Sequence, residues 1–357
     1  MLRRLDRYMV GQFSRVLGLA LVSFVAIYVV VDLIDHLDEF MIRDTSTLDI
    51  ARYYVHYVPY IIILTLPIGV LLATLFVVGG MGSANELVAI KAAGISMYRV
   101  AWPLMRVGAL ISVVAILLGE LVVPRSNDTR LQILDLRATG FAGVGRTHHL
   151  TQQDRTGFTV YAGRYDPESM RATNVTIVEV RDSRLQRRID ASEMRWDAEG
   201  WLLVNAADRT FHGEGEQLET HPMMRLPRLT LRPADLARVE KLPEQMAFLE
   251  LRDYIRRVRL AGGDASRWLV DLHLKVAFPL ASLMMVWLGF PVAARSWRGG
   301  RALYVGFTLL IGFLFFVVVR AGQALGRSGD LSPVIGAWGG DLLFLVVGLA
   351  LFHWTRK

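Results

Sequence analysis

The sequence predicts a polytopic α-helical membrane protein: six transmembrane helices in a 3+3 arrangement, with an all-β domain inserted between the two halves. Hydrophobic residues make up 53% of the 357 residues, and the mean hydropathy is +0.36, values typical of membrane proteins. Six apolar runs are each long enough to cross a bilayer, which takes about 20 residues. A long polar region with short β-type runs separates the third apolar run from the fourth.

Residues 1–124 contain the first three predicted spans. Residues 1–15 place apolar side chains at helical spacing with Arg between them, which predicts an interfacial elbow before the first span. Pro59 and Pro67 lie within the second span and are expected to bend it. The three spans are expected at about Phe13–Ile34, Tyr54–Val78 and Val100–Val123.

Residues 125–267 have the pattern of a separate β domain. Short β-type runs at Phe158–Tyr161, Asn174–Val180 and Trp201–Val204 are separated by turn signals, and Trp196 and Trp201 flank one turn as in a hairpin. Regular short strands without a helical period favour a sandwich or a jelly roll. A helical segment, Gln245–Leu260, then leads to the next span.

Residues 268–357 contain the last three spans, expected at about Trp268–Ala294, Ala302–Arg320 and Pro333–Trp354. The N-terminus, the 80–99 and 295–301 loops and the C-terminal tail are basic, whereas the 35–52 loop is acidic on balance. Since short basic loops stay in the cytoplasm, both termini and the 80–99 loop are expected there. The β domain is then expected on the opposite side of the membrane.

The connection at residues 83–94 is expected to be a short helix. Ser83 followed by Glu86 predicts a capping box at its start, and Gly94 predicts a left-handed turn at its end. Asn85, Glu86 and Lys91 point in three directions, and the residues between them are apolar. A helix that is apolar nearly all round is normally buried, so we expect it to dock into a groove on another protein. The alternative is a surface helix half sunk in lipid headgroups.

Few ionisable residues lie inside the predicted spans, where charge is costly. Asp32 and Arg320 lie at the outer ends of spans one and five, Lys275 about two turns into span four, and Asp341 deepest, in span six. In one interpretation, Lys275, Arg320 and Glu120 reach the outer interface. In the other, Lys275 and Arg320 bind an anionic lipid headgroup, and Asp32 and Asp341 are their counter-ions when the site is empty.

Motifs for enzymatic chemistry are missing from the sequence. It contains no P-loop, no Gly-x-Ser-x-Gly, no His-Glu-x-x-His and no Cys, so we expect no catalytic centre, cofactor or thiolate metal site in this chain. His148 and His149 are adjacent on a predicted strand and would point to opposite faces, a poor arrangement for a metal. The net charge of +7 comes mostly from Arg and is expected at the cytoplasmic edge of the membrane, not on nucleic acid.

Several stretches together resemble a known family. They are Leu5-Asp6-Arg7-Tyr8, Asn85 to Gly94, Gly119-Glu120 with Pro124, Leu272 to Lys275 with Pro279, and Gly299-Gly300-Arg301. Over its whole length the chain resembles the lipopolysaccharide-export permeases of the LptF/LptG (YjgP/YjgQ) type. The Leu-Asp-Arg-Tyr opening is more similar to the LptG branch.

The resemblance implies an inner-membrane protein of Gram-negative bacteria that forms the membrane part of an ABC transporter. An LptF-like permease would pair with this chain, and two copies of the ATPase LptB would bind ATP and Mg²⁺. The pair would extract lipopolysaccharide and pass it through periplasmic β-jellyroll domains to an LptC-like bridge protein. The acyl chains would travel along Phe158, Val160, Val175 and Ile177.

The resemblance also implies that residues 83–94 form the coupling helix that contacts the ATPase, with Glu86 among the contacts. It implies further that spans one and five of the paired permeases form a lateral gate. Family members often carry a basic residue near the outer end of span one, where this chain has Asp32, so the charges of these two gate helices are expected to be exchanged. The residues expected at the ATPase are Ser83, Asn85, Glu86, Leu87, Ile90 and Lys91.

Two other functions fit parts of the pattern. An ABC-coupled scaffold that transmits force instead of moving lipid would share the docking helix and the outer domain, but would lack a lipid-filled cavity. A secondary transporter needs carboxylates near the middle of the bilayer and broken helices, for which Asp341 after Gly339-Gly340 is the only indication.

Overall fold

The computed structural model describes residues 2–42, 45–138, 147–154, 156–166, 169–181, 184–197, 200–212, 215–236, 243–260, 264–295 and 300–354. The chain forms two compact units. The helical unit comprises residues 1–130, 243–255 and 265–357, and the sheet unit comprises residues 131–242 and 256–264. The predicted segment 125–267 contains the β domain together with its connecting helix, and within it residues 243–255 belong to the helical unit.

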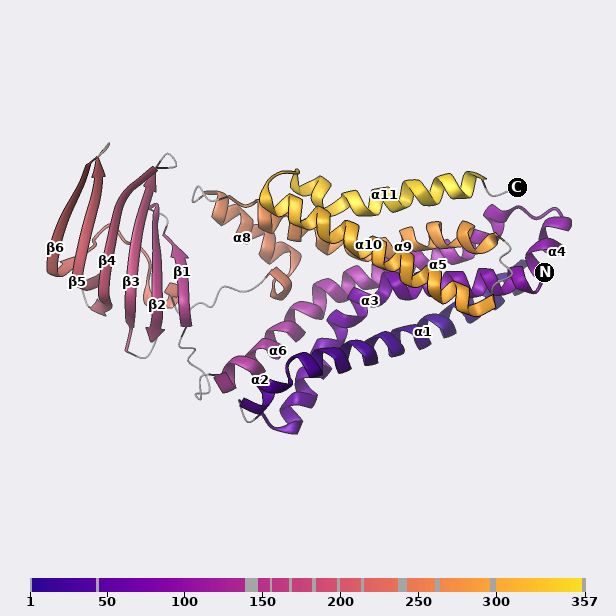
Figure 1. Ribbon diagram of the computed structural model, residues 1–357, viewed down its shortest axis with the longest axis horizontal. Coiled ribbons are helices and arrows are strands. Elements are labelled where there is room, and N and C mark those ends of the chain that lie inside the picture. Colours follow the sequence, from indigo (N-terminus) through magenta and orange to yellow (C-terminus); the bar gives the residue numbers. More distant parts are fainter. Residues whose placement is uncertain are drawn as a thin grey trace. The chain divides into compact units, whose positions relative to one another are not determined.

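The helical unit contains six helices that are long and apolar enough to cross a membrane, which confirms the predicted number. They run side by side in Figure 1. Two short helices complete the first half of the unit, one after the first span and one between the second and third spans. The elements are α1 (Leu2–Asp35), α2 (Leu37–Ile42), α3 (Thr47–Ser83), α4 (Glu86–Ala92), α5 (Met97–Leu121), α9 (Ser266–Ala294), α10 (Gly300–Ser328) and α11 (Pro333–Trp354).

The N-terminal segment does not form the predicted elbow. Helix α1 is continuous from Leu2 to Asp35, and Met9 and Phe13 are fully buried in the main hydrophobic cluster of the unit. The spacing of four residues that suggested an interfacial helix belongs instead to a face packed on the protein. The alternation of Arg with apolar residues could not distinguish lipid headgroups from a neighbouring helix.

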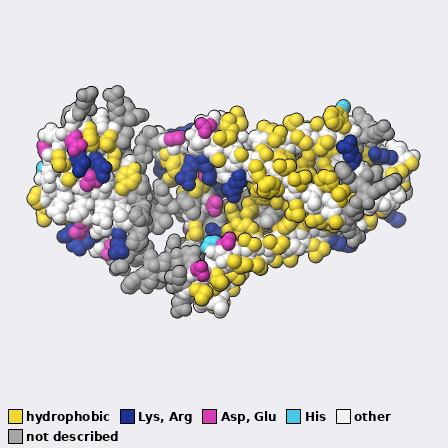
Figure 2. Space-filling model, in the orientation of Figure 1, with side chains coloured by type: hydrophobic (Ala, Val, Ile, Leu, Met, Phe, Trp, Pro, Cys, Tyr) yellow, Lys and Arg dark blue, Asp and Glu magenta, His cyan; other side chains and the backbone are white. Residues whose placement is uncertain are grey.

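Helix α9 occupies the centre of the helical unit, in contact with α3, α5, α10 and α11. Close backbone approach allows this packing: a Cβ on Gly348 of α11 would lie 3.0 Å from the backbone nitrogen of Leu288 in α9. The outward side chains of α1 and α10 are mainly apolar, and Figure 2 shows hydrophobic side chains over much of the visible face of the long helices. Such an exterior is suited to lipid or to another membrane subunit.

The connecting segments of the helical unit are fixed by polar contacts. They include α6 (Val123–Ala138), the 3₁₀ turn η1 (Pro243–Gln245) and α8 (Phe248–Leu260). Both carboxylate oxygens of Glu120, near the end of α5, accept a hydrogen bond from the Phe248 backbone N–H at 2.8 Å. Asn127 in α6 donates to the backbone oxygen of Glu244 at 3.4 Å. Glu120 therefore satisfies a free amide at the start of α8.

The sheet unit contains one antiparallel sheet with strand order β1-β2-β3-β4-β5-β6. An inserted all-β domain is thus confirmed, and so is the Trp196–Trp201 hairpin pair. The described strands form one open sheet in chain order. Strand periodicity does not encode strand order. The strands are β1 (Thr147–Gln153), β2 (Phe158–Asp166), β3 (Arg171–Arg181), β4 (Arg184–Asp197), β5 (Gly200–His212) and β6 (Gly215–Arg225).

A crease crosses the sheet at one level. At this level one residue in each of β2 to β6 is left out of the regular strand pairing. These residues are Gly163, Asn174, Ser192, Asn205 and Pro222. Asn174 and Asn205 have φ angles of 53° and 52°, a left-handed conformation that Asn tolerates better than most residues. A Cβ at Gly163 would lie 3.1 Å from the Cβ of Asn174.

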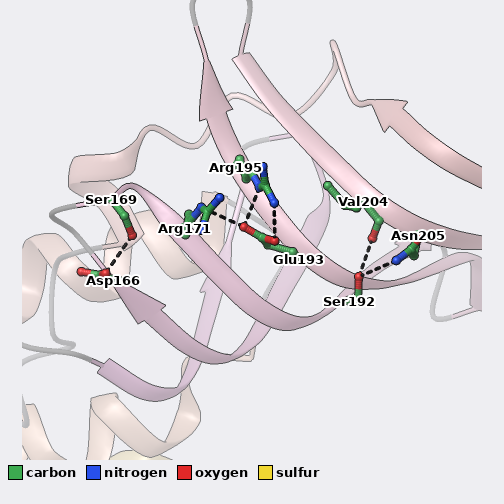
Figure 3. Close-up of polar contacts among 8 residues, drawn as sticks. All are labelled: Asp166, Ser169, Arg171, Ser192, Glu193, Arg195, Val204 and Asn205. Atoms are coloured by element: carbon green, nitrogen blue, oxygen red, sulfur yellow. Dashed lines mark hydrogen bonds and ion pairs between the residues drawn. The ribbon is translucent and has the colours of Figure 1, made fainter.

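The crease changes which side chains face the inside. On either side of it buried residues alternate along β2 to β5, but across it they are three apart, as in Ala162 and Tyr165, or Leu203 and Ala206. The same face therefore stays buried on both sides. Ser192 Oγ donates to the Val204 carbonyl at 3.0 Å and accepts from Asn205 Nδ2 at 3.3 Å, which joins β4 to β5 at this level (Figure 3).

The inner face of the sheet is covered by the chain that follows β6. Leu226, Leu229, Leu231 and Leu236, the last of them in α7 (Pro233–Leu236), are buried in the same cluster as the sheet residues. Trp201 Nε1 donates to the Leu231 carbonyl at 2.7 Å. These contacts close the hydrophobic core of the sheet unit.

Candidate functional site

The connection between α3 and α5 begins differently from the prediction. Helix α3 continues to Ser83, whose Oγ donates to the Gly80 carbonyl at 2.9 Å. Asn85 follows with φ +58° and precedes α4 without a side-chain capping bond. The predicted Ser83–Glu86 capping box is therefore wrong, because Ser83 ends one helix instead of starting the next. The left-handed turn at Gly94 is confirmed, with φ +74°.

Helix α4 has one inward and one outward face. Leu87 is only 3% exposed and lies in the main hydrophobic cluster, against which Ile90 also packs. Val88 is 60% exposed, and Ala89, Lys91 and Ala92 are exposed beside it. Leu87 was predicted to contact a partner, but it anchors α4 to its own chain instead.

The outward face of α4 is mainly apolar and exposed. Val88 is the large apolar side chain that sequence reasoning did not single out. A signal for it existed: Leu87 and Ile90 are three residues apart, the spacing of one helix face, and Val88 lies away from that face. Lys91 in the last turn places a positive charge where the helix dipole favours it.

Of the four residues predicted at the lipid headgroup or gate, Asp32 has partners on α3 and at His36, which directly follows α1. It accepts a hydrogen bond from Tyr54 Oη at 3.1 Å, and its Oδ2 lies 3.6 Å from His36 Nδ1. Arg320 is exposed and donates to Gln323 Oε1 at 3.0 Å on its own helix. The structure therefore does not pair Asp32 with Arg320.

Lys275 and Asp341 lie on two helices that pack against each other, α9 and α11, but the described structure shows no ion pair between them. Asp341 is 2% exposed, and its Oδ2 has no hydrogen-bond partner among the described residues. Within the described chain no ion pair joins these four residues, so the predicted counter-ion arrangement is absent. Depth in the membrane indicated that they need partners, but not which ones.

An aromatic cluster near the C-terminal end of α1 and the N-terminal end of α3 was missed. The Arg130 guanidinium lies 4.0 Å from the ring centroid of Tyr57 and 5.6 Å from that of Tyr53, a cation–π geometry. Tyr28 and Tyr57 share a hydrogen bond of 3.2 Å. Tyr53, Tyr57 and Tyr60 recur at helical spacing, a signal that could have predicted one aromatic face.

The predicted lipid path lies inside the core of the sheet unit. Phe158, Val160, Val175 and Ile177 are each at most 1% exposed. Alternation correctly predicted that these residues share the inner face of the sheet. It could not predict that Leu226, Leu229 and Leu231 cover that face, so in the described structure these four residues lie in a closed core.

Charged pairs lie on the strands of the sheet unit. Arg187 binds Asp208 through two nitrogens, at 2.9 and 2.6 Å, and this hydrogen bonding raises the Arg187 pKa. Glu193 accepts from Arg195 Nε at 2.6 Å and lies 3.0 Å from Arg171 Nε (Figure 3). The bond from Arg195, with the two positive charges, lowers the Glu193 pKa. The described residues contain no His, Asp or Glu cluster suited to a metal; the side chains of His148 and His149 lie outside them.

Comparison with known proteins identifies the family to which this chain belongs. The family model for the lipopolysaccharide export system permease LptF/LptG matches residues 7–354. The chain belongs to the LptF/LptG family. It is 22% identical to the Escherichia coli K12 lipopolysaccharide export system permease protein LptG, over 97% of each chain. It is 23% identical to the Haemophilus influenzae LptG, again over 97% of each.

Similarity within the LptF/LptG family is uneven. Escherichia coli K12 LptF is 25% identical, but only over 91 residues, which are 26% of this chain and 25% of that protein. The matches to LptG relatives extend over nearly the whole chain, which confirms the greater similarity to the LptG branch.

Proposed function

We propose that this chain is a permease subunit of an ATP-driven ABC transporter that extracts lipopolysaccharide from the inner membrane for export. The family match over residues 7–354 carries this proposal. Six candidate spans support a membrane-embedded subunit, and the absence of a P-loop from the sequence supports a separate ATPase that binds ATP and Mg²⁺. The other proposed partners are an LptF-like permease, two copies of an LptB-like ATPase and an LptC-like bridge protein.

The ATPase is proposed to bind the outward face of α4. Val88, Ala89 and Ala92 offer an apolar surface, with Lys91 beside it and Glu86 half-buried in the first turn. Leu87 holds the helix on the body of the unit, so a force on α4 would reach α3 and α5. The basic 80–99 loop supports a cytoplasmic position for α4. By the same rule both termini are cytoplasmic and the sheet unit is periplasmic.

Lys275 and Arg320 are proposed to contact anionic lipid headgroups independently of each other. Arg320 is exposed and has only a neutral partner, Gln323, in its hydrogen bond. Reversing the charge at Arg320 is expected to reduce cross-linking to lipopolysaccharide. Unchanged cross-linking would remove Arg320 from the lipid contacts.

Affinity purification of the full chain in mild detergent, with mass spectrometry of proteins and lipids, tests the proposal. We expect the wild type to retain an ATPase subunit and lipopolysaccharide. Val88→Asp should lose the ATPase, whereas Leu249→Asp should keep it, since Leu249 on α8 is equally exposed, at 61%, but distant in sequence from α4. An ATPase without lipopolysaccharide would favour the force-transmitting scaffold. Retention of the ATPase by Val88→Asp would contradict the α4 contact.

A further inference from the structure

The N-terminal turns of α1 are joined to the start of α5 by an ion pair between residues 93 positions apart. Arg99 Nη1 donates to Asp6 Oδ1 at 3.1 Å, and Arg99 Nη2 donates to Asp6 Oδ2 at 2.9 Å. Two parallel bonds fix the orientation of both side chains and not only their separation. Both groups are partly shielded from solvent, with exposed side-chain fractions of 34% for Arg99 and 25% for Asp6.

The ion pair lies beside the connection from α4 to α5. Helix α4 ends at Ala92, Gly94 makes the turn, and Ser96 caps α5 by accepting from the Arg99 backbone N–H at 3.4 Å. Arg99 is thus in the first turn of α5, held by the same cap that starts the helix. A displacement of α4 would act first on this turn.

Apolar packing supports the same joint. Met9 and Phe13, about one and two turns after Asp6, belong to the cluster that contains Leu87 of α4 and Met97 and Val100 of α5. The inner end of α1 is therefore in one packed body with α4 and α5. Farther along, α1 exposes large apolar side chains such as Val22, Ile27 and Ile34.

We propose that Asp6 and Arg99 are positioning residues that transmit displacement of α4 to α1. The proposal rests on the function proposed above, in which an ATPase moves α4. When that movement shifts the first turn of α5, the Arg99 fork pulls the Asp6 carboxylate with it. Because α1 is a continuous helix, its exposed outer part then moves against whatever surrounds it. The ion pair thereby connects the ATPase contact to a membrane-facing helix.

The test uses the complete complex of this chain with its paired permease and ATPase, in vesicles that contain lipopolysaccharide. ATP hydrolysed and lipopolysaccharide released are measured together. Asp6→Asn and Arg99→Gln are each expected to lower the lipid released per ATP about fivefold, a typical size for loss of coupling along such a joint. Retention of the ATPase should stay unchanged. Arg106→Gln is the matched control, since Arg106 lies on the same helix, over the Trp102 ring at 5.6 Å.

Two rescue variants separate coupling from simple stability. The exchange Asp6→Arg with Arg99→Asp should restore much of the lost release, because the pair is re-formed. The chain has no Cys, so Asp6→Cys with Arg99→Cys can be joined by a short thiol cross-linker, and cross-linking should raise release per ATP.

Normal release per ATP in both single variants would overturn the inference, as would a cross-link that leaves release low. If the wild type retains no ATPase, the proposed function itself fails. If the wild type is coupled but the Asp6 and Arg99 variants are also fully coupled, only the present inference fails.

Discussion

Helix α4 and the inner face of the sheet are two apolar surfaces that the sequence predicts to meet something outside the chain. In α4 the structure divides the apolar residues, with Leu87 inside and Val88 outside. In the sheet all four predicted lipid-path residues are inside, under the segment that follows β6. The difference teaches that apolar periodicity identifies a face, whereas the rest of the fold decides whether that face is open.

The largest expected effect contrasts two neighbouring residues of α4. Leu87→Asp should lower the free energy of unfolding by about 3–5 kcal/mol, because it leaves an uncompensated charge in the core. Val88→Asp should change it by less than about 0.5 kcal/mol. Thermal unfolding of the purified proteins in detergent measures both. Equal loss in the two variants would mean that α4 is not divided as described.

The closed state of the sheet can be tested at Ile177. Ile177→Ala should cost about 2–5 kcal/mol of stability, the usual range for removing a large buried aliphatic side chain. Tyr161→Ala, at an exposed position on the neighbouring strand, should cost much less. Loss of secondary structure on heating gives the comparison. An Ile177→Ala protein as stable as the wild type would indicate an open lipid path instead of a core.

The cover over the sheet has its own test at Trp201. Trp201→Phe keeps a large ring but leaves the Leu231 carbonyl without its donor, which should cost about 1–3 kcal/mol. Binding of a hydrophobic dye to the sheet unit should rise as the cover loosens. Trp196→Phe provides the control, since Trp196 is less buried and contacts Trp201 through its ring. Equal dye binding in the two variants would argue against a cover held at Trp201.

The crease should respond to backbone conformation. Asn205→Ala should destabilise the protein by about 1–2 kcal/mol, the cost of a left-handed conformation for an ordinary L-residue. Asn205→Gly should cost less, because glycine adopts positive φ freely. Both lose the bond to Ser192, so their difference isolates the backbone. Identical unfolding midpoints would show that the side chain alone matters.

The smallest expected effect is a pH dependence on the sheet surface. Because the pKa of Glu193 is lowered in the folded protein, its contribution to stability is complete above the ordinary glutamate value of 4.5. It is lost as the pH falls from there through the lower folded value. Glu193→Gln should flatten the acid limb of the stability curve. An unchanged acid limb would mean that Arg171 and Arg195 do not stabilise the carboxylate.

The six spans and the inserted β domain could be predicted because each rests on a local signal. A run of about 20 apolar residues defines a span whatever surrounds it, and the turn signal from Asp197 to Gly200 indicated that Trp196 pairs with Trp201. The predicted elbow failed because it depends on contacts with distant residues, whereas the predicted capping box failed because Ser83 belongs to the preceding helix. The order of the strands could not be predicted from strand periodicity. Phe13 meets other helices, Ser83 stays within α3, and strand order is set by the whole sheet.

The candidate site was predictable in position but not in detail. The 83–94 connection was located by its composition, and Gly94 by its conformational freedom. The inward direction of Leu87 and the Asp6–Arg99 pair could not be predicted, since they depend on how α1, α4 and α5 meet. The sequence indicated that the charges at Asp32, Lys275, Arg320 and Asp341 need partners, but it did not identify Tyr54 as the partner of Asp32 or Gln323 as the partner of Arg320. Among the described residues, Asp341 Oδ2 has no hydrogen-bond partner.

The crease through Gly163, Asn174, Ser192 and Asn205 fixes the register of neighbouring strands at one level. A residue inserted within one strand would move the crease residue of that strand out of line with those of its neighbours. The side chains that follow the insertion in that strand would then point outward. A residue added where two strands join would leave the number of residues from strand end to crease unchanged in both strands. A label or a binding loop grafted onto this domain should therefore be placed where two strands join. The number of residues from each strand end to the crease should be kept.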